Sequence, residues 1–274
     1  MHMNCYEEGA LRDLGGSPAE IYERHTVQRF SLMGAWDLLD LQPPRSGDRA
    51  LDVACGTGAV TRLVAERVAS GGRAIGLDVD TAMLAVGRTV VTHPNVAWLQ
   101  AGALELPFAA GVFDLIFCQQ GLQFFSNRLE ALREMRRVLR SGGRLGISCW
   151  RSVEDSPPYA AIERALGRRL GPARSALPRF ALGDGDQLQR LIQDAGFREV
   201  RVHRRTTLVE WPSTDLFVRA VAAGAPTMTG ALGEQNETVL AAISAEVETD
   251  MHAFLQASGT LRFSMGNHHV TARA

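Results

Sequence analysis

Two carboxylates and a glycine loop mark the part of the sequence best suited to hold a ligand. In the stretch LDVACGTGAV, Asp52 lies within an apolar run, and Gly56 and Gly58 follow it directly before a helical pattern. Asp78 ends the next apolar run, twenty residues after Gly58. Glycines at the carboxyl end of a parallel strand allow a tight turn and close approach of a ligand, and an acid at this spacing suits a ribose diol. The pattern therefore predicts a site for an adenosine-bearing ligand.

The residues around the loop narrow the choice of ligand. A dinucleotide fingerprint would have Gly or Ala three residues after Gly58, where Thr61 stands, and the Lys-Ser/Thr pair of a phosphate-binding loop is absent. A buried Asp52 is costly unless it is hydrogen-bonded or meets a cation, so the loop favours a ligand with a cationic amino-acid end. The alternative is a glycine turn needed only for packing, with Asp78 or Asp80 capping the next helix.

Polar and aromatic residues beyond the loop are candidates for binding a second molecule. Gln119, Gln120 and Gln123 follow a predicted strand, and glutamine can orient an acceptor by hydrogen bonds but is not a base near neutral pH. His25, beside Tyr22 in a predicted helix, is the better candidate for a base, with an ordinary surface histidine as the alternative. The seven histidines show no metal-ligand spacing, and no metal is expected. Aromatic residues that belong to the core or line an apolar pocket are Trp36, Phe124, Trp150, Tyr159, Phe180 and Trp211.

Strands that alternate with helices are expected to position these residues. The predicted strands are 50–54, 73–77, 96–99, 112–118, 144–149 and 199–208, with a strand or hairpin at the C-terminal end. The predicted helices are 22–30, 32–41, 59–69, 81–91, 186–196 and 128–139, the last of which is stopped by Gly142-Gly143. This alternation predicts an α/β fold with a doubly wound, mostly parallel sheet and helices on both of its faces.

A single domain accounts for the whole chain of 274 residues. We expect an N-terminal helical cover at 1–45 that begins with a mobile lead-in, a cofactor-binding core at 46–150, and helical lid insertions at 151–183 and 212–258. A net charge of −1 gives no reason to expect a nucleic-acid partner. Four dispersed cysteines, with no signal peptide and no membrane span, favour a reducing cytoplasm. The oligomeric state stays open.

The motifs resemble those of the class I S-adenosylmethionine-dependent methyltransferases. LDVACGTG is similar to the first motif of that family and GLDVDTAML to the second, and LPFAAGVFDLIFCQQGLQFF and ALREMRRVLRSGGRLGISCW are similar to the later ones. The nearest branch contains ubiquinone/menaquinone C-methyltransferases and many bacterial natural-product methyltransferases. The resemblance covers Tyr22 to Trp150. It implies a Rossmann-like, seven-stranded sheet whose last strand is antiparallel.

The resemblance also assigns expected roles. The cofactor is S-adenosyl-L-methionine and the product S-adenosyl-L-homocysteine. Asp78 takes the ribose and Met83 lies near the adenine, whereas Gly102 stands where the family often has an acid that binds the adenine amino group. Gln123 stands where this branch often has a histidine. The residues expected to bind the cofactor are Tyr22, Asp52, Ala54, Cys55, Gly56, Thr57, Gly58, Asp78, Val79, Met83, Gly102, Ala103, Leu104, Gln119 and Gln120.

The implied reaction is metal-independent methyl transfer to carbon, nitrogen or oxygen of a small apolar or aromatic acceptor. Proximity and orientation would drive it, with Gln123 and His25 as the catalytic candidates. Two alternatives remain. A non-catalytic or cyclase-like relative would bind the same cofactor without transferring its methyl group, and a NAD-dependent oxidoreductase would prefer a dinucleotide.

Overall fold

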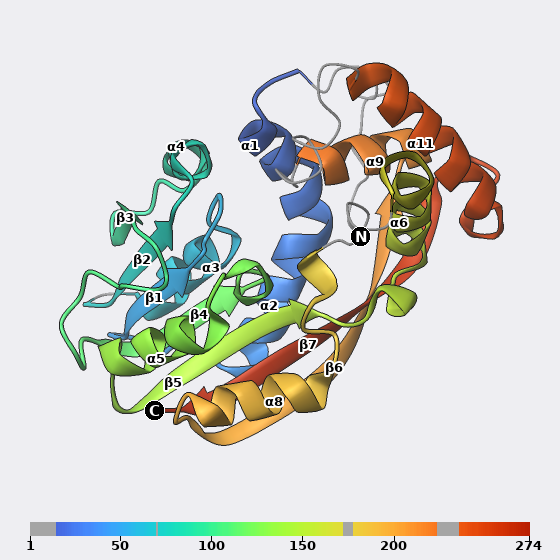
Figure 1. The fold of residues 1–274 in the computed structure, drawn as a ribbon. Helices are drawn as coiled ribbons and strands as arrows, with labels where there is room; N and C mark the ends of the chain where they lie inside the picture. The colour runs from blue at the N-terminus through green and yellow to red at the C-terminus, as the bar shows by residue number, and fades with distance from the viewer. Residues whose placement is uncertain (1–14, 70, 172–177, 224–235) are drawn as a thin grey trace.

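Seven strands form one sheet in the order β3-β2-β1-β4-β5-β7-β6 (Figure 1). The first five strands run parallel, and β7 lies antiparallel between β5 and β6. The predicted doubly wound sheet with an antiparallel last strand is therefore confirmed. The strands are β1 (Arg49–Val53), β2 (Arg73–Asp78), β3 (Val96–Gln100), β4 (Phe113–Gln119), β5 (Leu139–Trp150), β6 (Arg198–Trp211) and β7 (Leu261–Arg273).

The computed structural model describes residues 15–69, 71–171, 178–223 and 236–274. Most of the expected lead-in, 1–14, lies outside these residues. None of the described helices has the length and apolar character needed to cross a membrane. The helices are α1 (Pro18–Ile21), η2 (Tyr22–Ser31), α2 (Leu32–Leu41), α3 (Ala59–Val68), α4 (Thr81–Val90), η3 (Leu122–Phe124), α5 (Arg128–Val138), η4 (Val153–Asp155), α6 (Pro157–Leu170), η5 (Pro178–Phe180), α8 (Gly185–Asp194), α9 (Thr214–Ala223), α11 (Asn236–Asp250) and η7 (His252–Phe254).

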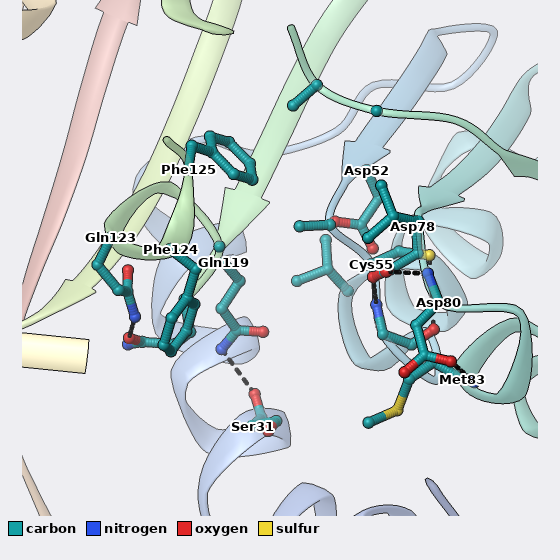
Figure 2. Close-up of a pocket in the computed structure, with 18 of the residues that line it drawn as sticks. Ser31, Asp52, Cys55, Asp78, Asp80, Met83, Gln119, Gln123, Phe124 and Phe125 are labelled. Atoms are coloured by element: carbon teal, nitrogen blue, oxygen red, sulfur yellow. Dashed lines mark hydrogen bonds between the residues drawn. The ribbon is translucent and has the colours of Figure 1, made fainter. Parts of the chain in front are cut away.

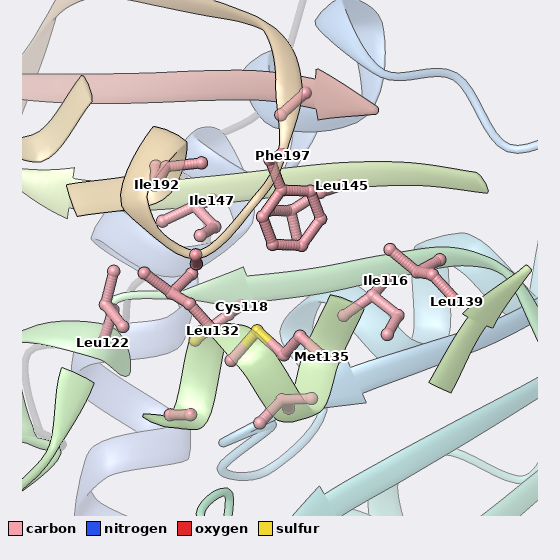
Figure 3. Packing of buried hydrophobic residues seen from close by; sticks show 14 of the residues in the cluster. Ile116, Cys118, Leu122, Leu132, Met135, Leu139, Leu145, Ile147, Ile192 and Phe197 are labelled. Atoms are coloured by element: carbon pink, nitrogen blue, oxygen red, sulfur yellow. The ribbon is translucent and has the colours of Figure 1, made fainter. Parts of the chain in front are cut away.

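Helices cover both faces of the sheet because successive strand residues point to opposite sides. Leu115 and Phe117 of β4 pack with α2 and α3 in one apolar cluster. Ile116 and Cys118 face the other way and pack with α5 and α8, where Figure 3 shows Met135 in the same cluster. Strands that are apolar on both faces are typical of a parallel sheet between two helical layers.

A third apolar cluster joins α6, α9 and α11 to the ends of β6 and β7 (Figure 1). At its centre Phe217 packs against Trp211 and Phe263, with ring centroids 5.4 and 5.5 Å apart. Trp211 thus belongs to the core. Trp36 belongs to neither core nor pocket, because it is exposed and stacks under the guanidinium of Arg67.

Two local expectations are corrected. Gly142-Gly143 does not stop the preceding helix, which ends at Val138; the glycines lie inside β5. There, pairing with β4 jumps from Phe113–Leu139 to Leu115–Arg144, so the glycines occupy an irregular stretch of the strand. The two helices expected near the N-terminus form one continuous rod from α1 through the π-helical η2 to α2, since the backbone stays helical at both junctions.

Three glycines, one of them in the loop after β1, pack against the ring of Trp98. A Cβ placed on Gly58 would lie 2.4 Å from the Trp98 ring, and one on Gly76 or Gly87 would lie 2.8 Å from it. The three glycines come from the loop after β1, from β2 and from α4. The indole of β3 therefore packs directly against the backbone of all three elements, and the absence of side chains there is a packing requirement.

We expect Gly58→Ala to destabilise the fold more than Gly47→Ala. Both glycines have positive φ, +88° and +84°, so each alanine incurs a left-handed penalty of about 1–2 kcal/mol. Only at Gly58 does the new Cβ meet a ring, which adds about 1–3 kcal/mol of overpacking. Urea denaturation measures the difference, which should shrink in a Trp98→Leu background. Equal losses in the two single variants would contradict this role of Trp98.

Candidate functional site

A cavity of about 840 Å³ lies at the carboxyl ends of β1, β2 and β4 (Figure 2). This is the edge at which the sequence placed the ligand. All of the predicted site residues except Gly58 and His25 line the cavity: Tyr22, Asp52, Ala54, Cys55, Gly56, Thr57, Asp78, Val79, Met83, Gly102, Ala103, Leu104, Gln119, Gln120 and Gln123.

The glycine loop is tied to the end of β2 through Asp78. The amide of Gly56 donates to Oδ2 of Asp78 at 2.8 Å, and the amide of Asp80 donates to Oδ1 at 3.0 Å. Asp80, in turn, caps α4 by accepting from the amides of Ala82 and Met83 at 2.8 and 3.2 Å. Capping is therefore the role of Asp80, while the carboxylate of Asp78 lines the cavity and holds the loop.

Asp52 is a buried carboxylate under the same loop. Its side chain is 4% exposed, and its Oδ2 accepts from the hydroxyl of Thr61 at 2.6 Å. Burial raises the pKa of Asp52 from its ordinary value to about 7, against the lowering effect of the Thr61 hydrogen bonds. A cation in the cavity would favour the ionised form.

The helical rod covers the loop and is fastened to it by an ion pair. Glu23 of η2 accepts from the Thr57 hydroxyl at 2.5 Å and from the Arg62 guanidinium at 2.9 and 3.0 Å. The neighbouring Tyr22 lines the cavity, and its hydroxyl lies 3.3 Å from that of Ser31. Burial raises the pKa of Tyr22, so its phenol is neutral at physiological pH.

The far wall of the cavity offers flat apolar surface. Val79 and Leu104 are 66% and 39% exposed, which is unusual for large apolar side chains that line a cavity. A Cβ on Gly102 would meet only one atom, of Val79, at 4.0 Å, so the backbone there is open to a ligand. Together with Met83, these residues form a slot suited to a planar ring.

Three glutamines at the end of β4 form a chain of neutral amides. Gln119 donates to the Ser31 carbonyl at 2.8 Å, Gln123 donates to Oε1 of Gln120 at 3.0 Å, and Gln120 donates to Oδ1 of Asn267 at 2.9 Å. Gln120 has φ +55°, a strained value for a residue other than glycine. Oε1 of Gln123 is buried without a partner in the described structure, so it can accept a hydrogen bond from a ligand.

A smaller cavity of about 90 Å³ lies beside the large one. Six residues line both: Tyr22, Ser31, Gln119, Gln120, Phe124 and Arg179. The remaining wall of the smaller cavity is mostly aromatic, from Phe30, Trp150 and Tyr159. Of the predicted aromatic pocket, Phe124, Trp150 and Tyr159 thus line this space, and Phe180 packs edge-on against Tyr159.

The structure does not bring Gly58 or His25 to either cavity. Gly58 serves the contact with Trp98 described above. His25 is buried at 5% exposure, and neither ring nitrogen has a partner among the described residues. Burial, with the charges of Arg29 and Arg24, lowers its pKa to about 4. The prediction of His25 as the base is therefore wrong, because it is a neutral core histidine.

Several lining residues escaped the sequence analysis: Ser31, Asp80, Phe125, Arg128, Arg179 and Asn267. Phe125 and Arg128 directly follow the glutamine stretch and were accessible from position alone. Ser31 and Asn267 come from η2 and β7, and only the folded chain brings them to β4. No three His, Cys, Asp or Glu side chains converge as a metal site in the part of the chain described here.

The arrangement suits a nucleoside with a cationic end. Asp78 can accept from a diol, the slot at Val79 and Leu104 can take a flat base, and Asp52 can face a positive charge. The glycine loop exposes its backbone for close approach.

Comparison with known proteins supports this reading. Residues 51–147 match a family described as a methyltransferase domain. A 2-phytyl-1,4-naphtoquinone methyltransferase of Thermosynechococcus vestitus is 43% identical over 47% of this chain, and the match spans only 59% of that relative. A demethylmenaquinone methyltransferase of Staphylococcus haemolyticus is 29% identical over 68% of this chain and 80% of its own length.

A solved structure shares the fold. Phospholethanolamine N-methyltransferase 2 of Haemonchus contortus, which holds S-adenosylhomocysteine, superposes with a TM-score of 0.59 at 18% identity. The match covers 96% of this chain and 59% of that one. This chain is therefore similar over residues 51–147 to a methyltransferase domain, and similar in sequence to the two quinone methyltransferases.

Proposed function

We propose that this protein methylates a small ring-bearing acceptor held in the smaller, aromatic cavity. The observation that carries the proposal is the wall shared by the two cavities, since a ring held at Phe124 and Tyr159 would lie next to the cofactor. A volume of about 90 Å³ is on the order of one aromatic ring. The names of the two relatives, both acting on quinones, support a ring of quinone type.

The cofactor fits the larger cavity in one orientation. Asp78 accepts from the ribose hydroxyls, Val79 and Leu104 flank the adenine, and Asp52 faces the charged amino-acid end. Tyr22 closes the site from the covering rod. Gly102 supplies no side-chain acceptor, so only backbone groups of Ala103 and Leu104 are left to bind the adenine amino group.

The protein contributes alignment to the transfer. The sulfonium supplies an activated methyl group, so the chain has only to hold the nucleophile in line with it. Gln119 offers an amide group at the border of the two cavities for this purpose, and Gln123 offers one in the larger cavity, where it is bonded to Gln120 of the shared wall. Burial raises the pKa values of Tyr22 and Tyr159, so both phenols stay protonated near neutral pH and neither is available as a base.

We further infer that the chain works as one domain in a reducing cytoplasm. The buried, unpaired thiols of Cys55, Cys118 and Cys149 support the compartment. The rod that covers the loop and the aromatic wall from η2 and α6 support a single functional unit.

Thermal unfolding tests cofactor choice. S-adenosylmethionine or S-adenosylhomocysteine should raise the melting temperature, because a ligand at a hundred times its Kd stabilises the folded state by about 2.7 kcal/mol. NAD, NADP and ATP at equal concentration should do much less. A larger shift with NAD would indicate an oxidoreductase, and cofactor binding without methyl transfer to any ring acceptor would indicate a cyclase-like relative.

The affinity for the cofactor should increase as the pH is raised from below 7 to above it. Below that pH Asp52 is protonated in the free protein, and binding of a cationic end must first remove the proton. Calorimetry in buffers of different ionisation enthalpy should show proton release near pH 6, and the pH slope should vanish in Asp52→Asn.

Asp52→Asn should also change the stability of the fold, and the raised pKa of Asp52 predicts in which direction. The pKa of Asp52 is higher in the folded than in the unfolded protein, so its stabilising contribution is complete below about pH 4 and is lost as pH rises to 7. Asp52→Asn should therefore unfold at a higher temperature than wild type at pH 8. A lower melting temperature at pH 8 would refute the raised pKa.

Gln123→Leu should reduce kcat more than cofactor affinity. The change removes an amide that lines the larger cavity and donates to Gln120 of the shared wall, and it leaves the glycine loop alone. A misplacement of about 1 Å can cost on the order of a hundredfold in rate. Gln187→Leu on the exposed part of α8 is the control. Activity should survive EDTA; loss with EDTA and recovery with magnesium would contradict metal-independent transfer.

A further inference from the structure

The covering rod contains a π-helix of ten residues, η2, between the α-helical segments α1 and α2. At its end the Leu32 amide donates to the Val27 carbonyl, five residues back instead of four. π-Helical winding is rare, occurs mostly as single turns, and is frequent at functional sites. A π segment of this length beside two cavities therefore needs a cause in the surrounding structure and points to a role in the site.

The winding decides which side chains of η2 reach the cavities. Residues three and four apart share a face of an α-helix, whereas hydrogen bonds from i to i+5 bring together residues four and five apart. Tyr22, Thr26 and Ser31 have the latter spacing, and all three line the smaller cavity. Tyr22 and Ser31 also line the larger cavity, with their hydroxyls 3.3 Å apart. In an α-helix the two would be about 2.5 turns apart, at 3.6 residues per turn, and would lie on opposite sides.

Arg29 is the residue that an α-helical η2 would turn towards the cavities. It follows Tyr22 by seven residues, which is close to two α-helical turns. In the structure Arg29 lines neither cavity, and its guanidinium lies 5.0 Å from the ring centroid of Trp211. Rewinding η2 as an α-helix would therefore put the side chain of Arg29 where the hydroxyl of Ser31 now lies.

Gln119 supplies a hydrogen bond that the end of a π-helix lacks. Where bonding from i to i+5 gives way to bonding from i to i+4, two carbonyls compete for one amide, and one of them is short of a donor. Ser31 is the last residue of η2, and its carbonyl accepts from Nε2 of Gln119 at 2.8 Å (Figure 2). Gln119 thus satisfies, from the end of β4, the junction between the π and α winding.

Gly34 leaves room for that hydrogen bond. It lies within α2, where glycine is a poor helix former. A Cβ placed on Gly34 would lie 2.8 Å from Nε2 of Gln119. An alanine at this position would have to displace the amide, because a flexible side chain yields more easily than a packed helix. The glycine therefore keeps the amide of Gln119 within reach of the Ser31 carbonyl.

We propose that Gln119 is a positioning residue, which holds η2 in its π winding and so keeps Tyr22 and Ser31 on the wall shared by the two cavities. Glu23 fixes the other end of η2 to Thr57 of the glycine loop. The inference rests on the proposed function, because the shared wall separates the cofactor from the acceptor. Gln119 acts here through the backbone of η2, in addition to any contact of its amide with a ligand.

Protection of engineered cysteines tests which face of η2 meets the cofactor. Ser31→Cys and Arg29→Cys are alkylated with iodoacetamide, with and without S-adenosylhomocysteine, and mass spectrometry reports each thiol separately. A ligand at about a hundred times its Kd should slow alkylation at position 31 on the order of a hundredfold, because only the free fraction reacts. Alkylation at position 29 should not change. Protection at position 29, alone or equal to that at position 31, would overturn the inference.

Gly34→Ala tests the role of Gln119 without a change in the larger cavity, which Gly34 does not line. Displacing the amide should weaken S-adenosylhomocysteine binding about twofold to tenfold, the effect of one lost hydrogen bond, and should move protection from position 31 to position 29. Gln119→Met lacks the donor and should act in the same way, and adding Gly34→Ala to it should have no further effect. Gln28→Ala, on the exposed side of η2, is the control and should change neither affinity nor protection.

Two results separate the possible failures. If protection stays at position 31 in both Gly34→Ala and Gln119→Met, Gln119 does not hold the winding, and the inference is overturned while the proposed function stands. If wild type does not bind S-adenosylhomocysteine in calorimetry, the proposed function fails, and the role of this wall fails with it. Should Gly34→Ala fail to fold, the protection pattern of Gln119→Met decides the question.

Discussion

The hydrogen bond from the Gly56 amide to Asp78 holds the first glycine of the loop against the end of the neighbouring strand. It is possible because β1 and β2 run parallel and end at the same edge, with Val53 paired to Leu77. The Cys55 amide continues that alignment by donating to the Leu77 carbonyl at 3.0 Å. Without these two hydrogen bonds the amides of the loop would have no fixed direction. The cavity would then lose the wall to which the covering rod is fastened.

The covering rod depends on the loop in turn. Thr57 lies between the two glycines and donates to Glu23, whose carboxylate also pairs with Arg62 of the following helix. One buried acid thus joins the rod, the loop and α3. Opening the site by moving the rod would separate the buried Glu23 from the partly buried Arg62, and leaving a buried carboxylate without its partner is unfavourable. The structure therefore favours a cover that stays attached at Glu23.

Asp52 shows a conflict between stability and binding. A carboxylate buried beneath an apolar loop, with a pKa near 7, destabilises the folded chain at neutral pH. The same burial makes it an effective partner for a cation, because a low-dielectric setting strengthens the attraction. Residues that weaken the fold but strengthen ligand binding are expected at a binding site. Binding of a cation would therefore explain why an apolar strand carries an acid at position 52.

The glycine loop, the place of Asp78 and the alternation of strands and helices could be predicted from the sequence, because they depend on local spacing and on one edge of a parallel sheet. It did not reveal that Gly58 serves Trp98, since that contact joins the loop to β3, or that His25 faces the core, since helical periodicity does not show which side a rod turns to the sheet. Gly142-Gly143 reads as a helix stop by composition, but the shifted pairing of β5 absorbs both glycines.

The acceptor side was the least predictable part because its walls come from distant segments. Gln120 is held at φ +55° while it bonds to Asn267, some 147 residues away, and Arg179 reaches the border from a short turn. Such a strained amide persists only where its surroundings fix it from several directions. The amides at this wall are neutral, so they can orient an acceptor but cannot ionise it. Charge reaches this region instead from the guanidinium groups of Arg128 and Arg179, which line the larger cavity opposite in sign to Asp52 and Asp78.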